Sequence, residues 1–286
     1  MPKPKEIDKE ILKKVYRGRS ANAHKGDFGK VLVIGGSEKY TGTPGLNGKA
    51  ALNAMAGYRS GADLITIASV QEAVDVSSQF LPNLITLPLK GKKLTKSHLN
   101  TLLAESENND AFIIGGGLGK DRQTMELVRK FLKRVNIKGV VDADAIKALE
   151  GMDMDLSNFI LTPHSHEFAI LTGQKPGHSL YTRSLVVQKE AQAFGATILL
   201  KGHQDIISNG EETLINKTGN PYMTVGGTGD VLAGVIGSLI AQGNSLVDSA
   251  SAGSYINGKA AENTGRKRSL VATDLMEEIA KIVDSV

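Results

Sequence analysis

GNPYMTVGGTGDVLAGVIGSLIAQG, residues 219–243, joins a glycine-rich turn to an apolar helix that follows at once. The run Gly226-Gly227-Thr228-Gly229 lets the backbone approach a ligand closely, and the first free N–H groups of the helix point at any anion bound there. Asp230 stands in the same turn, although its charge would repel a phosphate. Such an aspartate makes sense if it accepts a proton from a hydroxyl that attacks a phosphoryl group, or if it only caps the helix.

Upstream of this stretch, apolar runs bounded by turn residues alternate with helical patterns. The predicted strands are Lys30–Ile34, Leu64–Ala68, Leu84–Leu87, Ala111–Ile114, Gly139–Val141, Phe159–Leu161 and Thr197–Leu200. The predicted helices between them are Leu46–Ser60, Met125–Val135 and Leu180–Phe194. Strands that are apolar on both faces and separated by helices indicate an α/β fold, with a mostly parallel central sheet covered on both sides.

The pattern changes after Lys201. Two short runs, Ile206–Ser208 and Thr213–Asn216, are split by Asn209-Gly210 and predict a hairpin with a tight primed turn. Three helices are then expected, at Asp230–Gln242, Ser245–Glu262 and Thr273–Val283. No linker, repeat or low-complexity segment interrupts the chain, so residues 1–286 are predicted to form one domain.

Composition narrows the class of protein. The 286 residues include 32 glycines and no cysteine, which excludes disulfides, thiolate metal sites and a cysteine nucleophile. No leader pattern and no apolar run of about 18 residues is present, so we expect a cytoplasmic protein that does not span a membrane. The net charge of +4 favours solvated basic helix faces over nucleic-acid binding, and it suits a polyanionic small substrate.

Glycine-rich or polar segments follow five of the predicted strands. They are Gly35-Gly36-Ser37, Gly115–Gly119, Asp142-Ala143-Asp144, Thr162-Pro163-His164 and Lys201-Gly202. In open parallel sheets, ligands collect at the carboxyl ends of the strands. The sequence therefore predicts a site at this edge, beside the anion-binding turn.

Several of these residues have two interpretations. Lys201 could reach a nucleotide phosphate or be an ordinary surface lysine. His164 could bind a substrate or be structural. Asp142 and Asp144 could bind magnesium through water, while Asp144 could equally cap a helix over Ala145–Leu149, and two acids are too few to specify a metal.

Two apparent nucleotide motifs fail on spacing. Gly42–Lys49 resembles a phosphate-binding P-loop, but its first glycine lies one residue too far out and Ala50 replaces the magnesium-binding Ser or Thr. The segment Gly115–Gly119 spaces its glycines as G-x-G-x-G, which does not match the dinucleotide fingerprint.

The ordered set of motifs resembles the ribokinase-like superfamily and, within it, the NAD(P)H-hydrate dehydratases. The matching segments are GDFGKVLVIGGSEKYTGTPGL (26–46), GGGLG (115–119), DADA (142–145), TPHSHE (162–167), KGHQD (201–205) and GNPYMTVGGTGDVLAG (219–234). The segment GGTGD alone indicates only the superfamily, whereas the whole series is specific. Thr43 departs from the alanine usual in the family. Asp205 replaces a threonine common in bacterial members, which leaves the choice between ADP and ATP open.

The resemblance implies a three-layer α/β/α, ribokinase-like fold and a lyase activity. Such an enzyme uses ADP or ATP to dehydrate the (S) form of hydrated NADH or NADPH, releasing the intact dinucleotide, phosphate and AMP or ADP. Asp230 would be the general base, and the N–H groups of Gly227, Thr228 and Gly229 would stabilise the transferring phosphoryl group. Magnesium would neutralise phosphate charge, and no protein ligand is assigned to it.

The resemblance also implies binding residues and an assembly. The nucleotide would be held by Lys201, Gly202, His203, Gln204, Asp205, Asn220 and Gly229. The hydrated dinucleotide would contact Thr43, Gly117, Gly119, His164 and Asp230. A homo-oligomer, often a tetramer, is expected, and no fused epimerase domain.

Two alternatives remain open from the sequence. A ribokinase-like kinase of a hydroxymethylpyrimidine or hydroxyethylthiazole vitamin precursor would share Asp230 and the anion-binding turn. It would not account for GGSEKYTG and TPHSHE. A nucleotide-binding module without catalysis would bind its ligand better without Asp230.

Overall fold

The computed structural model describes residues 4–38 and 53–286 of the chain. In this part, the strands form one sheet in the order β1-β10-β9-β8-β7-β6-β5-β2-β3-β4. Their bounds are β1 (Lys5–Glu6), β2 (Lys30–Ile34), β3 (Leu64–Val70), β4 (Ile85–Leu89), β5 (Ala111–Ile114), β6 (Lys138–Val141), β7 (Phe159–Leu161), β8 (Thr197–Leu200), β9 (Asp205–Ser208) and β10 (Thr213–Asn216). Every neighbouring pair is parallel except the two pairs that contain β9. The predicted mostly parallel sheet is confirmed.

The strand predictions hold best where apolar runs are sharply bounded. The bounds of β2, β5, β7, β8 and β10 agree with the prediction, β3, β6 and β9 shift by one or two residues at one end, and β4 shifts at both ends. Strand β1 was not predicted, since two residues carry no pattern. The tight primed turn is wrong: residues 209–212 separate β9 from β10, and the Asn209 side chain accepts hydrogen bonds from the N–H groups of Glu211 and Glu212.

The helices cover both faces of this sheet. Their bounds are α1 (Glu10–Val15), α3 (Gln71–Phe80), α4 (Leu99–Ser106), α5 (Arg122–Leu132), α6 (Asp144–Lys147), α7 (Ser165–Thr172), α8 (Leu180–Phe194), α9 (Thr228–Ala241), α10 (Leu246–Asn263) and α11 (Leu275–Val283), with short 3-10 turns η2 (Lys96–His98), η3 (Pro221–Met223) and η4 (Ala272–Asp274). Residues 53–59 are also helical. Among the described residues, no helix is long and apolar enough to cross a membrane.

Helix α5 and the helix before β3 depart from prediction in different ways. The predicted start of α5 at Met125 is wrong because Asp121 caps the helix by accepting a hydrogen bond from the N–H of Gln123, which begins α5 at Arg122. The predicted helix Leu46–Ser60 lies partly outside the described residues. Helix α8 has the predicted bounds.

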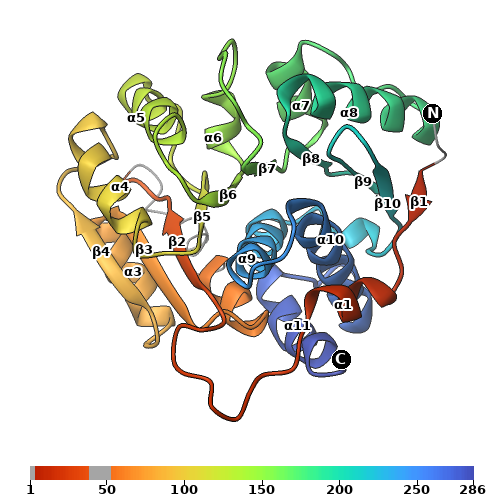
Figure 1. Cartoon of the computed structure of the whole chain (residues 1–286), viewed down its shortest axis with the longest axis horizontal. Helices are drawn as coiled ribbons and strands as arrows, with labels where there is room; N and C mark the ends of the chain where they lie inside the picture. Colours follow the sequence, from red (N-terminus) through yellow and green to blue (C-terminus); the bar gives the residue numbers. More distant parts are fainter. Residues whose placement is uncertain (1–3, 39–52) are drawn as a thin grey trace.

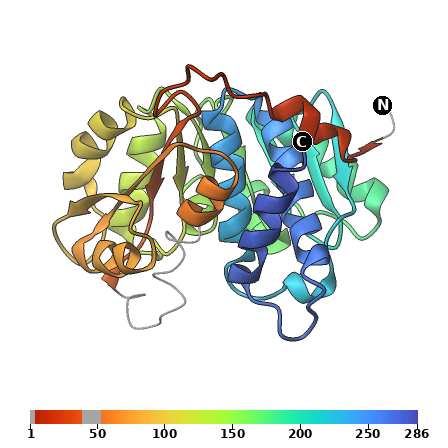
Figure 2. The same ribbon diagram turned by 90° about the horizontal axis from the view of Figure 1, so that it is seen from below.

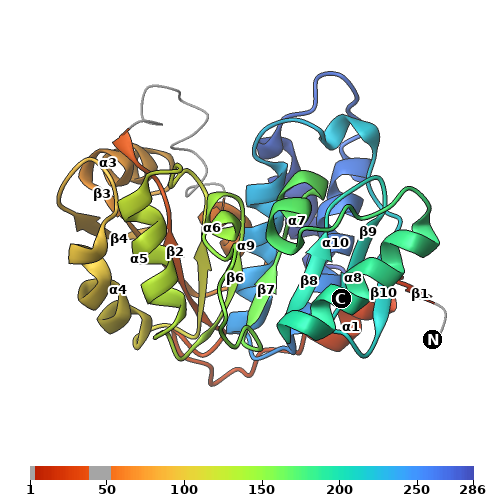
Figure 3. The ribbon, with the colours of Figure 1, turned by 90° about the horizontal axis from the view of Figure 1, so that it is seen from above.

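Two apolar layers flank the sheet, so the expected three-layer α/β/α architecture is confirmed. Along β2, Leu32 and Ile34 join the core under α4–α8, while Val31 and Val33 join the core under α9 and α10. Figure 1 shows the two helical groups on opposite sides of the sheet, and Figure 3 views the molecule from the side of α5–α8. Helix α9 packs across β5, β6 and β2 in the middle of the sheet. Its first turn is therefore fixed beside the ends of the central strands.

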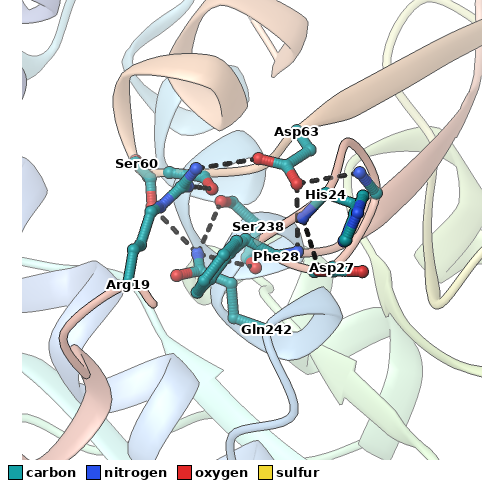
Figure 4. A network of polar contacts seen from close by, with 10 residues as sticks. Arg19, His24, Asp27, Phe28, Ser60, Asp63, Ser238 and Gln242 are labelled. Carbon is teal, nitrogen blue, oxygen red and sulfur yellow. Dashed lines mark hydrogen bonds and ion pairs between the residues drawn. The ribbon is translucent and has the colours of Figure 1, made fainter. Parts of the chain in front are cut away.

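The N-terminal segment 17–28 lies at the amino ends of β2 and β3, on the side of the sheet away from the carboxyl ends of the strands. The Asp63 carboxylate, just before β3, pairs with Arg19 at 2.9 Å and accepts hydrogen bonds from the N–H groups of Gly26 and Phe28 (Figure 4). The Arg19 guanidinium also lies over the Phe28 ring, 4.1 Å from its centroid. In Figure 2 this red segment runs along the end of the molecule opposite the loop that precedes α11.

Candidate functional site

The first turn of α9 provides an uncapped helix N-terminus. Gly227 is the N-cap residue, with φ at 99°, a left-handed conformation that glycine adopts without strain. No side chain caps this end, which is the feature of a helix N-terminus that can accept an anion. Asp230 lies in this first turn and is only 5% exposed. The interpretation of Asp230 as the helix N-cap is therefore wrong.

Lys201 places a positive charge beside this helix end. A Cβ atom added to Gly229 would lie 3.5 Å from Lys201 Nζ. The Lys201 ammonium group forms an ion pair with Asp142 at 3.0 Å. Burial would lower the pKa of Lys201, but the negative charges of Asp142, Glu167 and Asp230 outweigh it and raise the pKa above its usual value. Lys201 is therefore an ammonium ion at neutral pH and not an ordinary surface lysine.

Asp142 fixes the position of the Lys201 ammonium group. Its Oδ1 atom accepts hydrogen bonds from both Lys201 Nζ and the Thr162 hydroxyl, at 3.0 and 2.7 Å. Since Asp142, Thr162 and Lys201 follow β6, β7 and β8, one carboxylate ties together the ends of three neighbouring strands. The group is almost fully buried, so the pair is shielded from solvent.

The residues after Asp142 do not form a recognisable metal centre. Ala143 has φ at 48°, unusual for a residue with a side chain, and it is the N-cap of α6, so the prediction that Asp144 caps this helix is wrong. Asp144 instead pairs with Lys147 and accepts a hydrogen bond from the N–H of Gly119. Within residues 4–38 and 53–286, no group of three or more His, Cys, Asp or Glu side chains is arranged to hold a metal ion.

The turn after β8 is built around Asp205. Its Oδ1 atom accepts the N–H of Gly202 at 2.9 Å, and its Oδ2 atom accepts the Ser254 hydroxyl from α10 at 2.7 Å. Burial raises the pKa of Asp205, against the lowering effect of these hydrogen bonds and of Lys201 and Arg183. Asp205 thus shapes the loop that presents Gly202 and His203.

His164 has a structural role that its spacing did not reveal. It is the N-cap of α7, and its Nδ1 atom accepts hydrogen bonds from the N–H groups of His166 and Glu167. The Glu167 carboxylate accepts the N–H of His164 in return, which completes a capping box. The His164 side chain is still 52% exposed, and its Nε2 atom lies 3.4 Å from Oε1 of the Glu167 carboxylate.

One cavity of about 600 Å³ collects most of the predicted nucleotide-binding residues. Of the predicted site residues, it is lined by His164, Lys201, Gly202, His203, Asp205, Asn220, Thr228 and Gly229. Leu232, Met223 and Val225 add apolar walls, and Asn257 and Gly258 of α10 add a further wall. The anion-binding turn and Lys201 thus share a cavity with apolar surface, as a bound nucleotide requires.

The remaining predicted residues lie apart from this cavity lining. Gln204, Gly227 and Asp230 are not part of its lining, and Asp230 is buried in the first turn of α9. Gly117 accepts the Ser37 hydroxyl through its carbonyl at 2.9 Å, and Gly119 lines a second hollow of about 550 Å³ with Ser37 and Lys93. Thr43 lies outside the described residues.

Asn257 is a cavity residue that the sequence analysis missed. It lies in α10 far from every glycine-rich motif, and one asparagine among the buried serines, alanines and glycines of that helix carries no recognisable spacing. Helix α10 was predicted, but only the packing of α10 against α9 reveals that this position faces the cavity.

Comparisons with known proteins agree with this geometry. The family profile of NAD(P)H-hydrate dehydratase matches residues 31–283. The chain is 37% identical to the ADP-dependent (S)-NAD(P)H-hydrate dehydratase of Nitrosopumilus maritimus, over 98% of this chain and 96% of that protein. It is 38% identical to the bifunctional NAD(P)H-hydrate repair enzyme Nnr of Pyrobaculum aerophilum, over 93% of this chain. This chain spans about half the length of that bifunctional relative, 52%.

Solved structures show the same fold. The ADP/ATP-dependent NAD(P)H-hydrate dehydratase of Bacillus subtilis, crystallised with ATP and Mg²⁺, superimposes with a TM-score of 0.82 at 23% identity, covering 99% of both chains. A hydroxyethylthiazole kinase from Pyrococcus horikoshii is more distant, with a TM-score of 0.58 and 15% identity over 97% of this chain and 92% of that one. The fold is therefore ribokinase-like, and the chain belongs to the NAD(P)H-hydrate dehydratase family.

Proposed function

We propose that this protein uses ADP or ATP to dehydrate the (S) form of hydrated NADH or NADPH. The observation that carries the proposal is Asp230, buried in the first turn of an uncapped helix beside the ammonium group of Lys201. Family membership and the name of the Nitrosopumilus relative, matched along almost its full length, support the substrate.

The reaction begins with phosphoryl transfer. The 6-hydroxyl oxygen of the hydrate attacks the terminal phosphorus of the nucleotide, its proton passes to Asp230, and the bond to the leaving AMP or ADP breaks. Backbone N–H groups at Gly227, Thr228 and Gly229 are placed to stabilise the charge on the transferring group. Lys201 neutralises charge on the nucleotide phosphates from the facing wall of the cavity.

Elimination then restores the dihydronicotinamide ring. Hydroxide is a poor leaving group, whereas a phosphate ester leaves readily. The lone pair of the ring nitrogen expels phosphate from C6, and loss of a proton from C5 forms the new ring double bond. The products are NADH or NADPH, inorganic phosphate, and AMP from ADP or ADP from ATP.

The two reactants would enter from different sides of Asp230. We assign the nucleotide to the 600 Å³ cavity, with Lys201, Gly202, His203, Gln204, Asp205, Asn220 and Gly229 as its binding residues. We assign the hydrated dinucleotide to Thr43, Gly117, Gly119, His164 and Asp230. The second hollow, beside Gly119, supports this assignment. The 600 Å³ cavity is too small to hold a nucleotide and a dinucleotide together, so the dinucleotide needs a separate place.

The vitamin-kinase alternative receives less support. It shares the phosphoryl-transfer turn, but the kinase neighbour is structurally distant and the dehydratase neighbour is close. A binding module without catalysis would have no use for an aspartate that repels the nucleotide phosphates.

A coupled assay tests the proposal. Purified protein is incubated with hydrated NADH and either ADP or ATP, and the return of dihydronicotinamide absorbance is followed. We expect absorbance to rise only with nucleotide present and inorganic phosphate to appear in equal amount. Phosphorylation of hydroxyethylthiazole or hydroxymethylpyrimidine, without any recovery of NADH, would establish the kinase instead.

Further parts of the proposal concern the setting of the reaction. Magnesium would accompany the nucleotide phosphates. Asp142 and Asp144 are engaged with Lys201, Thr162, Lys147 and Gly119, so they do not offer a ready-made pair of metal ligands. We also propose that residues 1–286 act as one domain, in a cytoplasmic homo-oligomer. Light scattering during gel filtration measures the oligomeric state.

A further inference from the structure

Asn257 holds a hydrogen-bond acceptor that nothing in the described structure uses. The residue lies in α10, lines the 600 Å³ cavity and is 6% exposed. Its Nδ2 atom donates to the carbonyl of Thr228, the first residue of α9, at 3.4 Å. Its Oδ1 atom is buried and, within the described residues, accepts no hydrogen bond. An unpaired buried acceptor costs free energy, so its retention in a cavity wall points to a ligand.

The orientation of this side chain follows from its neighbour. A carbonyl oxygen accepts and never donates, so the NH₂ group of Asn257 must face Thr228 and the oxygen must face away. The bond to Thr228 is long, and the terminal torsion of asparagine is soft. The amide group can therefore turn by a small angle and bring Oδ1 to a ligand without leaving its place.

The surrounding wall fits the nucleoside half of a nucleotide. Leu232, one turn further along α9, and Val225 present apolar surface to the same cavity, whereas Lys201 and Gly229 stand at its charged side. Next to Asn257, Gly258 has no side chain, and a Cβ atom there would clash with Thr218. The segment at Thr218 thus approaches α10 closely beside Asn257, and all three residues line the cavity.

We propose that Asn257 Oδ1 accepts a hydrogen bond from an N–H or O–H donor on the nucleoside, and that it contributes to the choice of nucleotide. This inference rests on the proposed function for the identity of the ligand. Two donors have the required chemistry: the 6-amino group of adenine and a ribose hydroxyl. A 6-oxo purine presents an acceptor in place of the amino group and would leave Oδ1 unpaired.

Binding of nucleotide analogues distinguishes these donors. Calorimetry measures the affinities of ADP, inosine diphosphate and the 2′- and 3′-deoxy forms of ADP for the wild type and for Asn257→Leu. If the donor is the amino group, the wild type prefers ADP to inosine diphosphate by about fivefold or more, and the variant loses that preference. If the donor is a hydroxyl, the preference for ADP over one deoxy form disappears instead. Either result supports the proposal.

Asn244→Leu is the matched control. Asn244 is also a buried asparagine whose Nδ2 atom donates to a backbone carbonyl, that of Leu239 at 2.9 Å, but it does not line the cavity. We expect this variant to keep the wild-type preferences even if its melting temperature falls. Should Asn257→Leu fail to fold, Asn257→Ser, which keeps a small polar group, provides the same comparison of ratios.

The proposal is overturned if the preferences of a folded Asn257 variant equal those of the wild type. It fails together with the proposed function if the wild type binds neither ADP nor ATP. Recovery of NADH from its hydrate by wild type and Asn257 variant alike, with unchanged nucleotide preference, removes only the role of Asn257.

Discussion

At the scale of single residues, the chemistry depends on how charges are arranged around Lys201. One ammonium group faces the carboxylates of Asp142, Glu167 and Asp230 within a largely buried region. A negative phosphate brought to the α9 turn would compete with these carboxylates for the lysine. In the proposed function, Lys201 and the N-terminal end of α9 compensate the charge of the nucleotide phosphates.

Asp230→Asn tests the general base. The change preserves shape, so fold and nucleotide affinity should remain, while turnover should fall by about 10²–10⁴-fold because a neutral amide cannot take the proton. Steady-state assays of NADH recovery measure this. Asp248→Asn is a suitable control, since Asp248 also lies in the first turn of a helix but pairs with Lys14 on the surface. Near-normal turnover in Asp230→Asn would remove this residue from the mechanism.

Lys201→Met tests the phosphate contact. Loss of a charge-assisted hydrogen bond should weaken ADP and ATP binding by roughly tenfold to a hundredfold. The variant should also lose stability, because Asp142 is left as a buried charge without its cation. The double variant Lys201→Met with Asp142→Asn should recover stability but not affinity. Calorimetry and urea unfolding separate the two effects, and unchanged ADP affinity would place the nucleotide elsewhere.

At the scale of elements, the N-termini of two helices, α9 and α7, differ in how they are capped. Helix α9 begins with a glycine and leaves its N-terminus open, whereas α7 begins with a histidine that caps it. Both ends face the same cavity. In the proposed function, α9 binds the anion, while His164 caps α7 through Nδ1 and contacts the substrate with the exposed part of its ring, whose Nε2 atom also lies 3.4 Å from Glu167.

Two substitutions of His164 separate these tasks. His164→Asn keeps an acceptor at the N-cap and removes the outer ring, so the melting temperature should stay near the wild type. The Michaelis constant for the hydrated dinucleotide should rise, with a cost of about 1–3 kcal/mol, while that for nucleotide changes little. His164→Ala should lower both stability and substrate affinity. If His164→Asn leaves every kinetic constant unchanged, the histidine serves only as the cap.

The elements also show which structural features could be predicted from the sequence. Strands such as Ala111–Ile114 and Phe159–Leu161 were predictable because apolar runs and turn residues mark their ends. The places of the glycine-rich turn, before a helix, and of Lys201, after a strand, were predictable because apolar runs flank them, and their binding of an anion stays a prediction. The cap at His164 and the acceptor at Asn257 were not, since histidine is an uncommon N-cap and since Asn257 gains its meaning only from the packing of α10 on α9. Those roles depend on contacts between segments distant in the chain.

At the scale of the whole molecule, segment 17–28 links α1 to the sheet through Asp63. Burial alone would raise the pKa of Asp63, but hydrogen bonds from the N–H groups of Phe28 and Gly26 and the charge of Arg19 lower it below its usual value. A carboxyl group with a lowered pKa in the folded state stabilises the protein above its unfolded-state pKa of 3.8. That stabilisation is lost as the pH falls below this value.

Asp63→Asn should therefore be less stable than the wild type at pH 7, and the difference should shrink as the pH falls to about 3. Urea unfolding across this range measures the free energy of unfolding of both proteins. Asp27→Asn is the control, because its carboxylate accepts the local N–H of His24 in the same segment. A constant difference between wild type and Asp63→Asn at every pH would show that the ion pair and hydrogen bonds do not govern acid stability.

The pairing of β1 with β10 has a consequence for how the protein forms during synthesis. Lys5 lies opposite Leu214 in a parallel ladder, so β1 finds its partner only after the long segment between these two residues has been translated. Strands β2 and β3 can pair early, whereas β1 stays unpaired until β10 has been made. While β1 is unpaired, the charged residues Lys5 and Glu6 and the basic residues near them discourage association of this edge with other nascent chains.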